Sequence, residues 1–383
     1  MQYLHGDTAA RGVNMKTSRS RYFWKIAPLT MVFMVNMFCT PLMAKDVIKL
    51  TGAGASFPAP LYLRWFRDYY LAHPDSQVDY QAIGSGAGIN NFIDRRIDFA
   101  GSDLPMKPEE IDQVKGGVIQ IPITAGAIVL GFNIPGIENL RLSRDALAGI
   151  FLGTIARWND PRIASTNPDL ELPDLHITVV TRADSSGTSH VMSRHLAAIS
   201  KQFADTVGIA MSPNWPEALK KRGALIKGHG NGGVAAMVQA IPGAIGYMQY
   251  SYAYVTHLPI ASVENQHGEY VAPASESFRA AVEALRAEMD KDLIHDPPGA
   301  GSYPILSLSW LIVHKTYQDE AKYAAMKDVI QYCLTEGQNI SDKLGYIPLT
   351  EEAVDRIMIE VRSKRPVTEE TVDRIMKEAG SKQ

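Results

Sequence analysis

The sequence of 383 residues predicts an α/β protein, because short β-branched segments alternate along the chain with segments of helical periodicity. Three observations support this fold class. Segments of strand length occur at 47–50, 78–83 and 176–180. Each of them runs into a turn of glycine, serine or threonine, and each turn opens a pattern in which apolar residues recur at helical spacing.

The first strand, 47–50, leads into the turn TGAGAS at 51–56. We expect a helix over 57–72, with Pro58 and Pro60 in its first turn, where proline is tolerated. The inward face of this helix is predicted to carry Leu61, Trp65 and Tyr69.

Two further units of the same kind follow. The strand at 78–83 runs into the turn GSGAG and a helix predicted over 89–96. A shorter strand, 97–100, ends in the turn GSD at 101–103.

The fourth unit has the most unusual turn. The strand at 176–180 leads into TRADSSGTSH, at 181–190, and a helix is predicted over 191–203. Its inward residues are predicted to be Val191, Met192, Leu196, Ile199 and Phe203. The turn combines one arginine and one aspartate with small residues that leave backbone NH groups accessible.

These turns have the chemistry of an anion site. A helix N-terminus presents NH groups without intrahelical acceptors and about half a positive charge, and serine or threonine adds a hydroxyl donor. Several such ends together can hold an anion without an excess of cationic side chains. The alternative for any single turn is an ordinary Ser or Thr cap.

The first 44 residues read as a secretory signal peptide, with a basic region, an apolar stretch over 26–43 and the small-residue site LMA at 42–44. The alternative is a retained transmembrane helix, but the apolar run is short and interrupted by Pro28 and Asn36. Cys333 is the one cysteine that would remain after cleavage, so no intramolecular disulfide is expected. We expect a protein of the periplasm.

The remaining chain is acidic. Removing the five basic and one acidic residues of 1–44 leaves 33 basic and 40 acidic residues, a net charge near −7. This charge argues against nucleic acid and anionic membrane surfaces as partners.

Common enzyme motifs are missing from the sequence. It contains no phosphate-binding loop of the G-x-x-x-x-G-K-[ST] type, and Ile83 stands where a nucleophile elbow needs glycine. Ser186 and His190 could pair as nucleophile and base, but a helix N-terminus disfavours an imidazolium there. The ten histidines show no metal-ligand spacing, and GHGN at 228–231 is interpreted as a loop. We therefore expect no enzyme, no metal and no cofactor.

The segments TGAGASFPAPLYLRW, YQAIGSGAG, DFAGSDLP, VVTRADSSGTS and IPGAIGYMQY resemble the family of periplasmic phosphate-binding proteins of high-affinity phosphate ABC importers. FLGTIARWNDPRI and SLSWLIVHK agree with it as well, and the resemblance runs from about residue 47 to about residue 362. It implies that inorganic phosphate is bound, without its water shell, between two domains. The phosphate-binding residues it implies are Ser56, Phe57, Ser85, Asp103, Arg182, Ser186, Gly187 and Thr188. Asp184 would hold Arg182 in place.

Two of these roles have independent chemical support. Arg182 is the one cation in the four turns, and its planar fork suits a tetrahedral oxyanion. Asp103 can accept a hydrogen bond from a protonated phosphate, whereas sulfate has no proton to donate. The alternatives are a surface arginine capped by Asp184 and a helix-capping or turn aspartate ahead of Leu104 and Pro105. Ser185 stands where the family commonly has glycine, so positive φ there would cause strain.

The resemblance implies a two-lobed periplasmic-binding-protein fold, similar to type II, in which the chain crosses the hinge twice. The first lobe would comprise 45–123 and 304–383, and the second 124–303. The segment TEEAVDRIM at 350–358 is repeated as TEETVDRIM at 368–376, so 363–383 is predicted to be an added helical extension. A duplication without function is expected, with docking to a partner as the alternative.

The function implied is that of a monomeric, exported solute-binding protein that delivers inorganic phosphate to the permease and ATPase subunits of an ABC importer. Three other readings compete with it. An exported phosphatase would need a nucleophile, metal cluster or base; a binder of sulfate or molybdate should avoid Asp103. A surface or sensing protein could use the same scaffold.

Overall fold

The computed structural model describes residues 47–287 and 296–362. The predicted signal peptide, the extension 363–383 and the second repeat therefore lie outside the described residues. Within the described residues, no helix is both long enough and apolar enough to cross a membrane.

The described strands form one large sheet and one small sheet. The nine-stranded sheet has the order β2-β1-β3-β11-β4-β8-β6-β7, and β12 pairs with β4. Its strands are β1 (Ile48–Gly54), β2 (Ser76–Ala82), β3 (Phe99–Ser102), β4 (Val118–Asn133), β6 (Thr178–Arg182), β7 (Leu225–Gly228), β8 (Ala244–Gln249), β11 (Leu306–His314) and β12 (Tyr346–Ile347). The small sheet contains β5 (Arg141–Leu142), β9 (Ser262–Glu264) and β10 (Tyr270–Val271).

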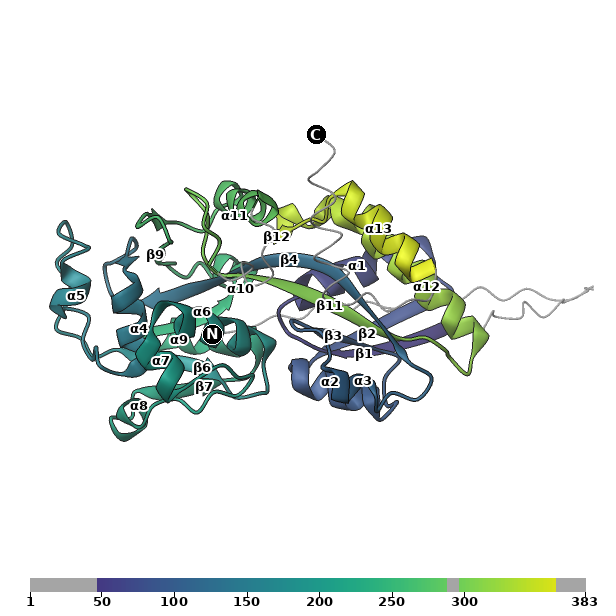
Figure 1. The fold of residues 1–383 in the computed structure, drawn as a ribbon, viewed down its shortest axis with the longest axis horizontal. Helices are drawn as coiled ribbons and strands as arrows, with labels where there is room; N and C mark the ends of the chain where they lie inside the picture. The colour runs from purple at the N-terminus through teal and green to yellow at the C-terminus, as the bar shows by residue number, and fades with distance from the viewer. Residues whose placement is uncertain (1–46, 288–295, 363–383) are drawn as a thin grey trace, which may run out of the picture. The chain divides into compact units, whose positions relative to one another are not determined.

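Helices alternate with these strands along the chain, as the α/β prediction requires (Figure 1). They are α1 (Ala59–Ala72), α2 (Ser85–Ile93), α3 (Pro108–Ile111), α4 (Arg144–Leu152), α5 (Pro161–Ala164), α6 (Gly187–Ile199), α7 (Lys201–Thr206), α8 (Glu217–Lys221), α9 (Gly230–Ala240), α10 (Tyr250–Val255), α11 (Ser275–Ala287), α12 (Glu320–Leu334) and α13 (Glu351–Arg362). Two 3-10 helices, η1 (Glu336–Ile340) and η2 (Asp342–Leu344), follow α12.

Strand β4 joins the two lobes (Figure 1). Its residues 118–127 pair with β11, and 128–133 pair with β8. Nearly all of its 16 residues are buried, which is typical of a strand covered on both faces. We use "first lobe" for β1, β2, β3 and β11 with α1, α2 and α12, and "second lobe" for β6, β7 and β8 with α6 and α9. The predicted boundaries at 123 and 304 stay a prediction.

The parallel strands of each lobe end at the same level. In the first lobe Gly54 pairs with both Ala82 and Gly101, and in the second lobe Arg182 pairs with Gly228. Helices α1, α2, α6 and α9 begin just beyond these carboxyl ends. This is the edge at which open α/β sheets bind ligands.

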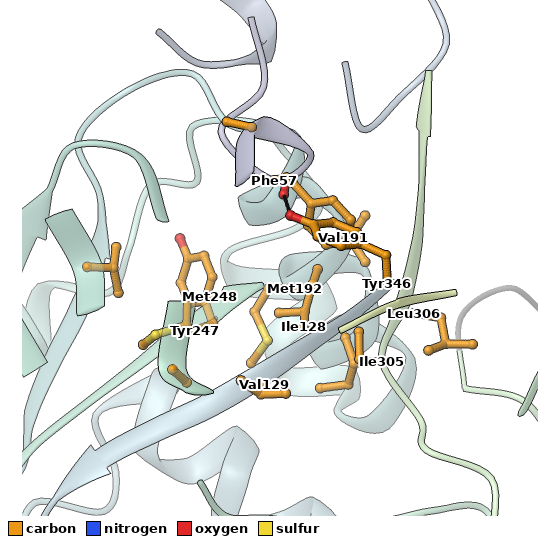
Figure 2. Close-up of a cluster of buried hydrophobic side chains, with 14 of the residues drawn as sticks. Phe57, Ile128, Val129, Val191, Met192, Tyr247, Met248, Ile305, Leu306 and Tyr346 are labelled. Atoms are coloured by element: carbon orange, nitrogen blue, oxygen red, sulfur yellow. Dashed lines mark hydrogen bonds between the residues drawn. The ribbon is translucent and has the colours of Figure 1, made fainter. Parts of the chain in front are cut away.

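The loop after β1 is fixed to the hinge region by a buried cluster (Figure 2). The ring of Phe57 packs edge-on against Tyr346, with centroids 6.2 Å apart, and the Tyr346 hydroxyl donates to the Phe57 carbonyl over 2.6 Å. Ile128 in β4 donates its NH to the carbonyl of Ile305, over 2.9 Å, beside this cluster.

Helix α1 begins at Ala59, two residues after the predicted start, whereas two other helices begin earlier than predicted. Helix α2 begins at Ser85 rather than at 89, and α6 begins at Gly187 rather than at 191. The single helix predicted over 191–203 is wrong, because α6 ends at Ile199 and the Ser200 hydroxyl caps α7 by accepting from the NH of Phe203. The glycine- and serine-rich turns at 84–88 and 185–190 are thus largely the first turns of α2 and α6.

Other local predictions are confirmed. Leu61, Trp65 and Tyr69 of α1 are buried, and the Trp65 indole donates to the Gly337 carbonyl over 2.6 Å. The hydroxyl of Thr350, the first residue of TEEAVDRIM, accepts from the NH of Ala353 over 3.3 Å and so caps α13.

Candidate anion-binding site

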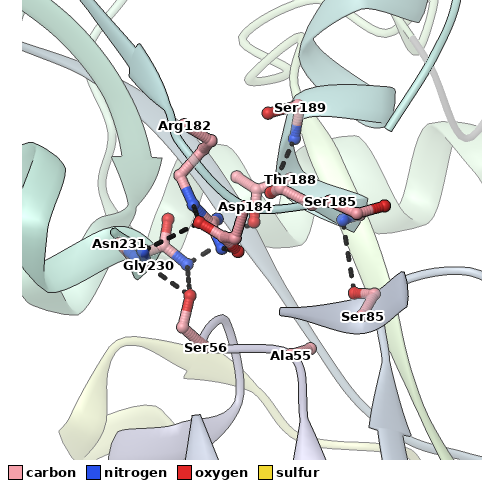
Figure 3. Close-up of polar contacts among 12 residues, drawn as sticks. Ala55, Ser56, Ser85, Arg182, Asp184, Ser185, Thr188, Ser189, Gly230 and Asn231 are labelled. Atoms are coloured by element: carbon pink, nitrogen blue, oxygen red, sulfur yellow. Dashed lines mark hydrogen bonds and ion pairs between the residues drawn. The ribbon is translucent and has the colours of Figure 1, made fainter. Parts of the chain in front are cut away.

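Four helix N-termini meet at the junction of the two lobes (Figure 3). Direct hydrogen bonds link their first turns: the Gly187 NH of α6 donates to Ser85 Oγ of α2 over 3.2 Å. The Asn231 NH of α9 donates to Ser56 Oγ, just before α1, over 2.9 Å. Each of these helices is at least nine residues long, so each contributes a substantial dipole and uncompensated NH groups.

Arg182 lies at the carboxyl end of β6 and donates three hydrogen bonds to its neighbours. Its Nε donates to Asp184 Oδ1 over 2.9 Å, and its Nη2 donates to Asp184 Oδ2. Its backbone NH donates to the Tyr247 hydroxyl over 3.3 Å. Only 2% of the Arg182 side chain is exposed, so the alternative of a surface arginine is wrong.

The Arg182–Asp184 pair leaves one donor uncommitted. Among the described residues, Arg182 Nη1 has no hydrogen-bond partner although it is buried. Burial by itself would raise the pKa of Asp184, but hydrogen bonds from Arg182 and the Gly230 NH outweigh it and hold that pKa below its usual value. Asp184 therefore remains ionised and fixes the guanidinium, while Nη1 stays available for an acceptor.

Asp103 supplies an acceptor atom that complements the free donor Arg182 Nη1. Its carboxyl group is buried, and the Thr188 hydroxyl donates to Oδ2 over 3.1 Å. Within the described part of the chain, Oδ1 has no partner. Burial raises the pKa of Asp103 to about 7, and the positive charge of Arg182 limits this rise. Asp103 lies in a bend just after β3, as the alternative of a turn aspartate has it, but it is almost fully buried.

The serine hydroxyls of the site are already hydrogen-bond acceptors. Ser85 Oγ accepts from the NH groups of Gly187, at 3.2 Å, and Asp103, at 3.4 Å. Ser56 Oγ accepts from both the NH and the side-chain amide of Asn231. Ser186 caps α6 by accepting from the NH of Ser189 over 3.1 Å. A hydroxyl that accepts in this way keeps its own proton for donation.

Glycine allows the two lobes to approach closely here. The Gly86 NH donates to the Ser185 carbonyl over 3.2 Å, and a Cβ at Gly86 would lie 2.4 Å from Ser185 Oγ. Ser185 itself has no positive φ, so the strain considered for serine at this position does not arise.

Hydrogen bonds bring together most of the predicted residues: Ser56, Ser85, Asp103, Arg182, Gly187 and Thr188, with their supporting residue Asp184. Ser186 lies beside them as the cap of α6, and the ring of Phe57 packs against Tyr346. The segment 228–231, interpreted as a loop, is the end of β7 and the start of α9, so that interpretation is wrong. Asn231 is consequently a site residue that sequence reasoning missed. Its signal was the same order of strand, glycine-rich turn and helix that marks the turns after β1, β2 and β6.

Two tyrosines of the site were also missed. The Tyr252 hydroxyl donates to the Ser56 carbonyl over 2.6 Å and so joins the second lobe to the loop after β1. The Tyr247 hydroxyl lies 2.6 Å from Ser189 Oγ, and burial raises the pKa of Tyr247 to about 12. Both phenols remain neutral hydrogen-bonding groups.

A nucleophile and base pair finds little support in the geometry. Ser186 and His190 are joined through the backbone, where the His190 NH donates to the Ser186 carbonyl over 3.1 Å. Burial, with Arg194 and Lys107 nearby, lowers the pKa of His190 to about 4. An imidazole of such low pKa is a weak general base at neutral pH.

Comparison with known proteins places this geometry in a class. The family model described as the PBP superfamily domain matches residues 40–336. A phosphate-binding protein PstS of Xylella fastidiosa is 38% identical over 315 residues, covering 81% of this chain and 84% of the relative. Another, of Pasteurella multocida, is 36% identical over 335 residues and covers 86% and 94%.

The chain therefore belongs to the PBP superfamily and, within it, to the family of the phosphate-binding proteins PstS. The solved structure of a phosphate-binding protein from Stenotrophomonas maltophilia has the same fold. It is 20% identical, with a TM-score of 0.60, and covers 81% of this chain and 93% of that chain. The two-lobed fold predicted from the sequence is thereby confirmed.

Proposed function

We propose that this chain is an exported solute-binding protein that holds inorganic phosphate between its two lobes and delivers it to an ABC importer. The observation that carries the proposal is the pair of buried, unpartnered atoms at the lobe junction, the donor Arg182 Nη1 and the acceptor Asp103 Oδ1. Buried polar atoms are rarely left without partners, so such a pair marks the place of a ligand that both accepts and donates.

Phosphate has this combination at neutral pH. Its ionised oxygens accept from Arg182 Nη1, from the hydroxyls of Ser56 and Ser85, and from NH groups near helix N-termini, including that of Phe57. Its remaining proton is donated to Asp103. Sulfate has no such proton, and its oxygen would face the lone pairs of a carboxylate. A site built around a hydrogen bond from its ligand can reject an analogue without it by a factor of about 10⁴ to 10⁵.

Each lobe supplies a different set of the proposed phosphate-binding residues. Ser56, Ser85 and Asp103 come from the first lobe, whereas Arg182 to Thr188 come from the second. An anion that touches both lobes favours the closed arrangement, by its differential affinity for it. The relatives named PstS and the predicted signal peptide support delivery, as a periplasmic monomer, to permease and ATPase subunits of an importer.

Calorimetric titration tests this function, using protein freed of ligand by unfolding and refolding. We expect tight one-to-one binding of inorganic phosphate. The same protein is then incubated with p-nitrophenyl phosphate, which an exported phosphatase would hydrolyse. Phosphate binding without hydrolysis supports a binding protein. Hydrolysis of p-nitrophenyl phosphate that is lost in Ser186→Ala would instead show that the protein is an enzyme. Molybdate in place of phosphate addresses the remaining oxyanion rival.

A further inference from the structure

Asn231 is a fully buried polar residue in the first turn of α9. It lies outside the four turns that the sequence predicts to bind the anion. It follows three residues after the end of β7, in the sequence Gly228-His229-Gly230-Asn231. Figure 3 shows its side chain between Ser56 of the first lobe and Thr188 of the second.

The orientation of the Asn231 amide is determined by its neighbours. The NH of Gln249, which can only donate, lies 3.1 Å from Asn231 Oδ1. The amide oxygen therefore faces β8, and the NH₂ group faces the site. There Nδ2 donates to Ser56 Oγ over 2.9 Å and lies 3.4 Å from Thr188 Oγ1.

This arrangement fixes the direction of the Ser56 hydroxyl. A serine oxygen has two lone pairs and one proton. Both lone pairs of Ser56 accept from Asn231, one from its backbone NH and one from its side chain, at 2.9 Å each. The Ser56 proton must then be donated to another group, and 97% burial keeps bulk water from serving that purpose.

We infer that Asn231 is a positioning residue, which turns the Ser56 hydroxyl into an obligate donor toward the bound anion while it ties α9 of the second lobe to the first. The inference rests on the proposed function, since it concerns the same site. Asn231 would orient the hydroxyl of Ser56, which binds phosphate, without contacting phosphate itself. The Ser56 proton would then be donated to the anion.

A double-mutant cycle in phosphate affinity tests this role. Asn231→Ala removes one donor to Ser56 and should weaken phosphate binding about tenfold, because the backbone NH still holds the hydroxyl. Asn231→Asp keeps the volume and the acceptor for Gln249 but places a carboxylate against Ser56 Oγ. The serine proton then turns to that carboxylate, and we expect a loss of more than about a hundredfold.

The same changes are repeated in a Ser56→Ala background. If Asn231 acts through Ser56, Asn231→Ala should there cost less than about threefold. Asn167→Ala is the matched control, because Asn167 is also buried and its amide bonds to the carbonyls of Arg141 and Ile163, at 2.8 Å each. It should lower the unfolding midpoint and leave phosphate affinity unchanged.

The outcomes are separable. Equal losses from Asn231→Ala with and without Ser56 would overturn the positioning role while leaving phosphate binding in place, as would full affinity of Asn231→Asp. Failure of the unaltered protein to bind phosphate would overturn the proposed function and, with it, this inference.

Discussion

Thr188 and Asp103 are 85 residues apart in the sequence and belong to different lobes, yet the Thr188 hydroxyl donates to Asp103 Oδ2 over 3.1 Å. The bond fixes the orientation of a buried carboxyl group, and it leaves Oδ1 as the acceptor within the site. One oxygen of Asp103, Oδ2, therefore links the two lobes, and the other, Oδ1, discriminates between anions.

The variant Asp103→Asn tests that division of roles. An amide can donate as well as accept, so it no longer repels an anion without a proton. We expect sulfate binding to become measurable by calorimetry, with phosphate affinity reduced about tenfold or more. Thr188→Val should weaken phosphate binding but still exclude sulfate, because the carboxylate remains. Exclusion of sulfate by Asp103→Asn would contradict the role assigned to Oδ1.

Arg182→Ala should impair both stability and binding. Removing the guanidinium leaves Asp184 without its main partner in a largely buried position, and breaking such pairs costs about 3 kcal/mol of unfolding free energy. Chemical denaturation of the ligand-free variant measures this cost. The double variant Arg182→Ala/Asp184→Asn should recover much of the stability but none of the phosphate affinity. Recovery of binding would show that Arg182 is structural.

Substitutions at two glycines of α2 should distinguish an effect on the contact between the lobes from an effect on the folding of the first lobe. A Cβ at Gly86 would lie 2.4 Å from Ser185 Oγ of the second lobe, whereas a Cβ at Gly88 would lie 2.5 Å from the Cα of Gly54 in the same lobe. Gly86→Ala should weaken phosphate binding and preserve the unfolding midpoint, since alanine favours a helix. Gly88→Ala should lower the midpoint. Identical behaviour of both variants would argue against the close approach of the lobes.

The stability of the ligand-free protein should depend on pH through Asp103. Its pKa is raised by burial from 3.8 to about 7, so the folded chain keeps a proton that the unfolded chain has lost. Stability from this group is complete below pH 4 and is lost as the pH rises to about 7, by about 4 kcal/mol.

The unfolding free energy of Asp103→Asn, relative to the unaltered protein, should accordingly rise between pH 4 and pH 7. His195 and His314, whose pKa values burial lowers to about 4, act in the opposite direction but are present in both proteins and cancel. A difference that does not change with pH would refute the raised pKa.

The sequence was most informative where local chemistry decides the structure. The turns at Ser56, Ser85 and Arg182 could be located because each follows a strand pattern and precedes a helix, and the turn at Asp103 because it follows a strand pattern. The starts of α2 and α6 were placed about four residues late, since Ser85 and Gly187 serve the first helical turn as well as the site. Apolar periodicity marks only the later turns of such helices.

Long-range pairing could not be predicted in the same way. Asn231 lies 175 residues from Ser56, and no local pattern shows that their side chains meet. The helix at 191–203 was predicted as one element because its apolar spacing continues past Ser200, where a hydroxyl cap starts a new helix. Burial likewise emerged from the structure alone, and it is burial that raises the pKa of Asp103.

Selection of a protonated oxyanion by this site can be tested by parallel titration of the unaltered protein with phosphate and sulfate at pH 8. At that pH Asp103 is ionised, since its pKa is about 7. We predict tight binding of phosphate and no detectable heat from sulfate at concentrations about a thousandfold higher. Sulfate binding of comparable strength would contradict it.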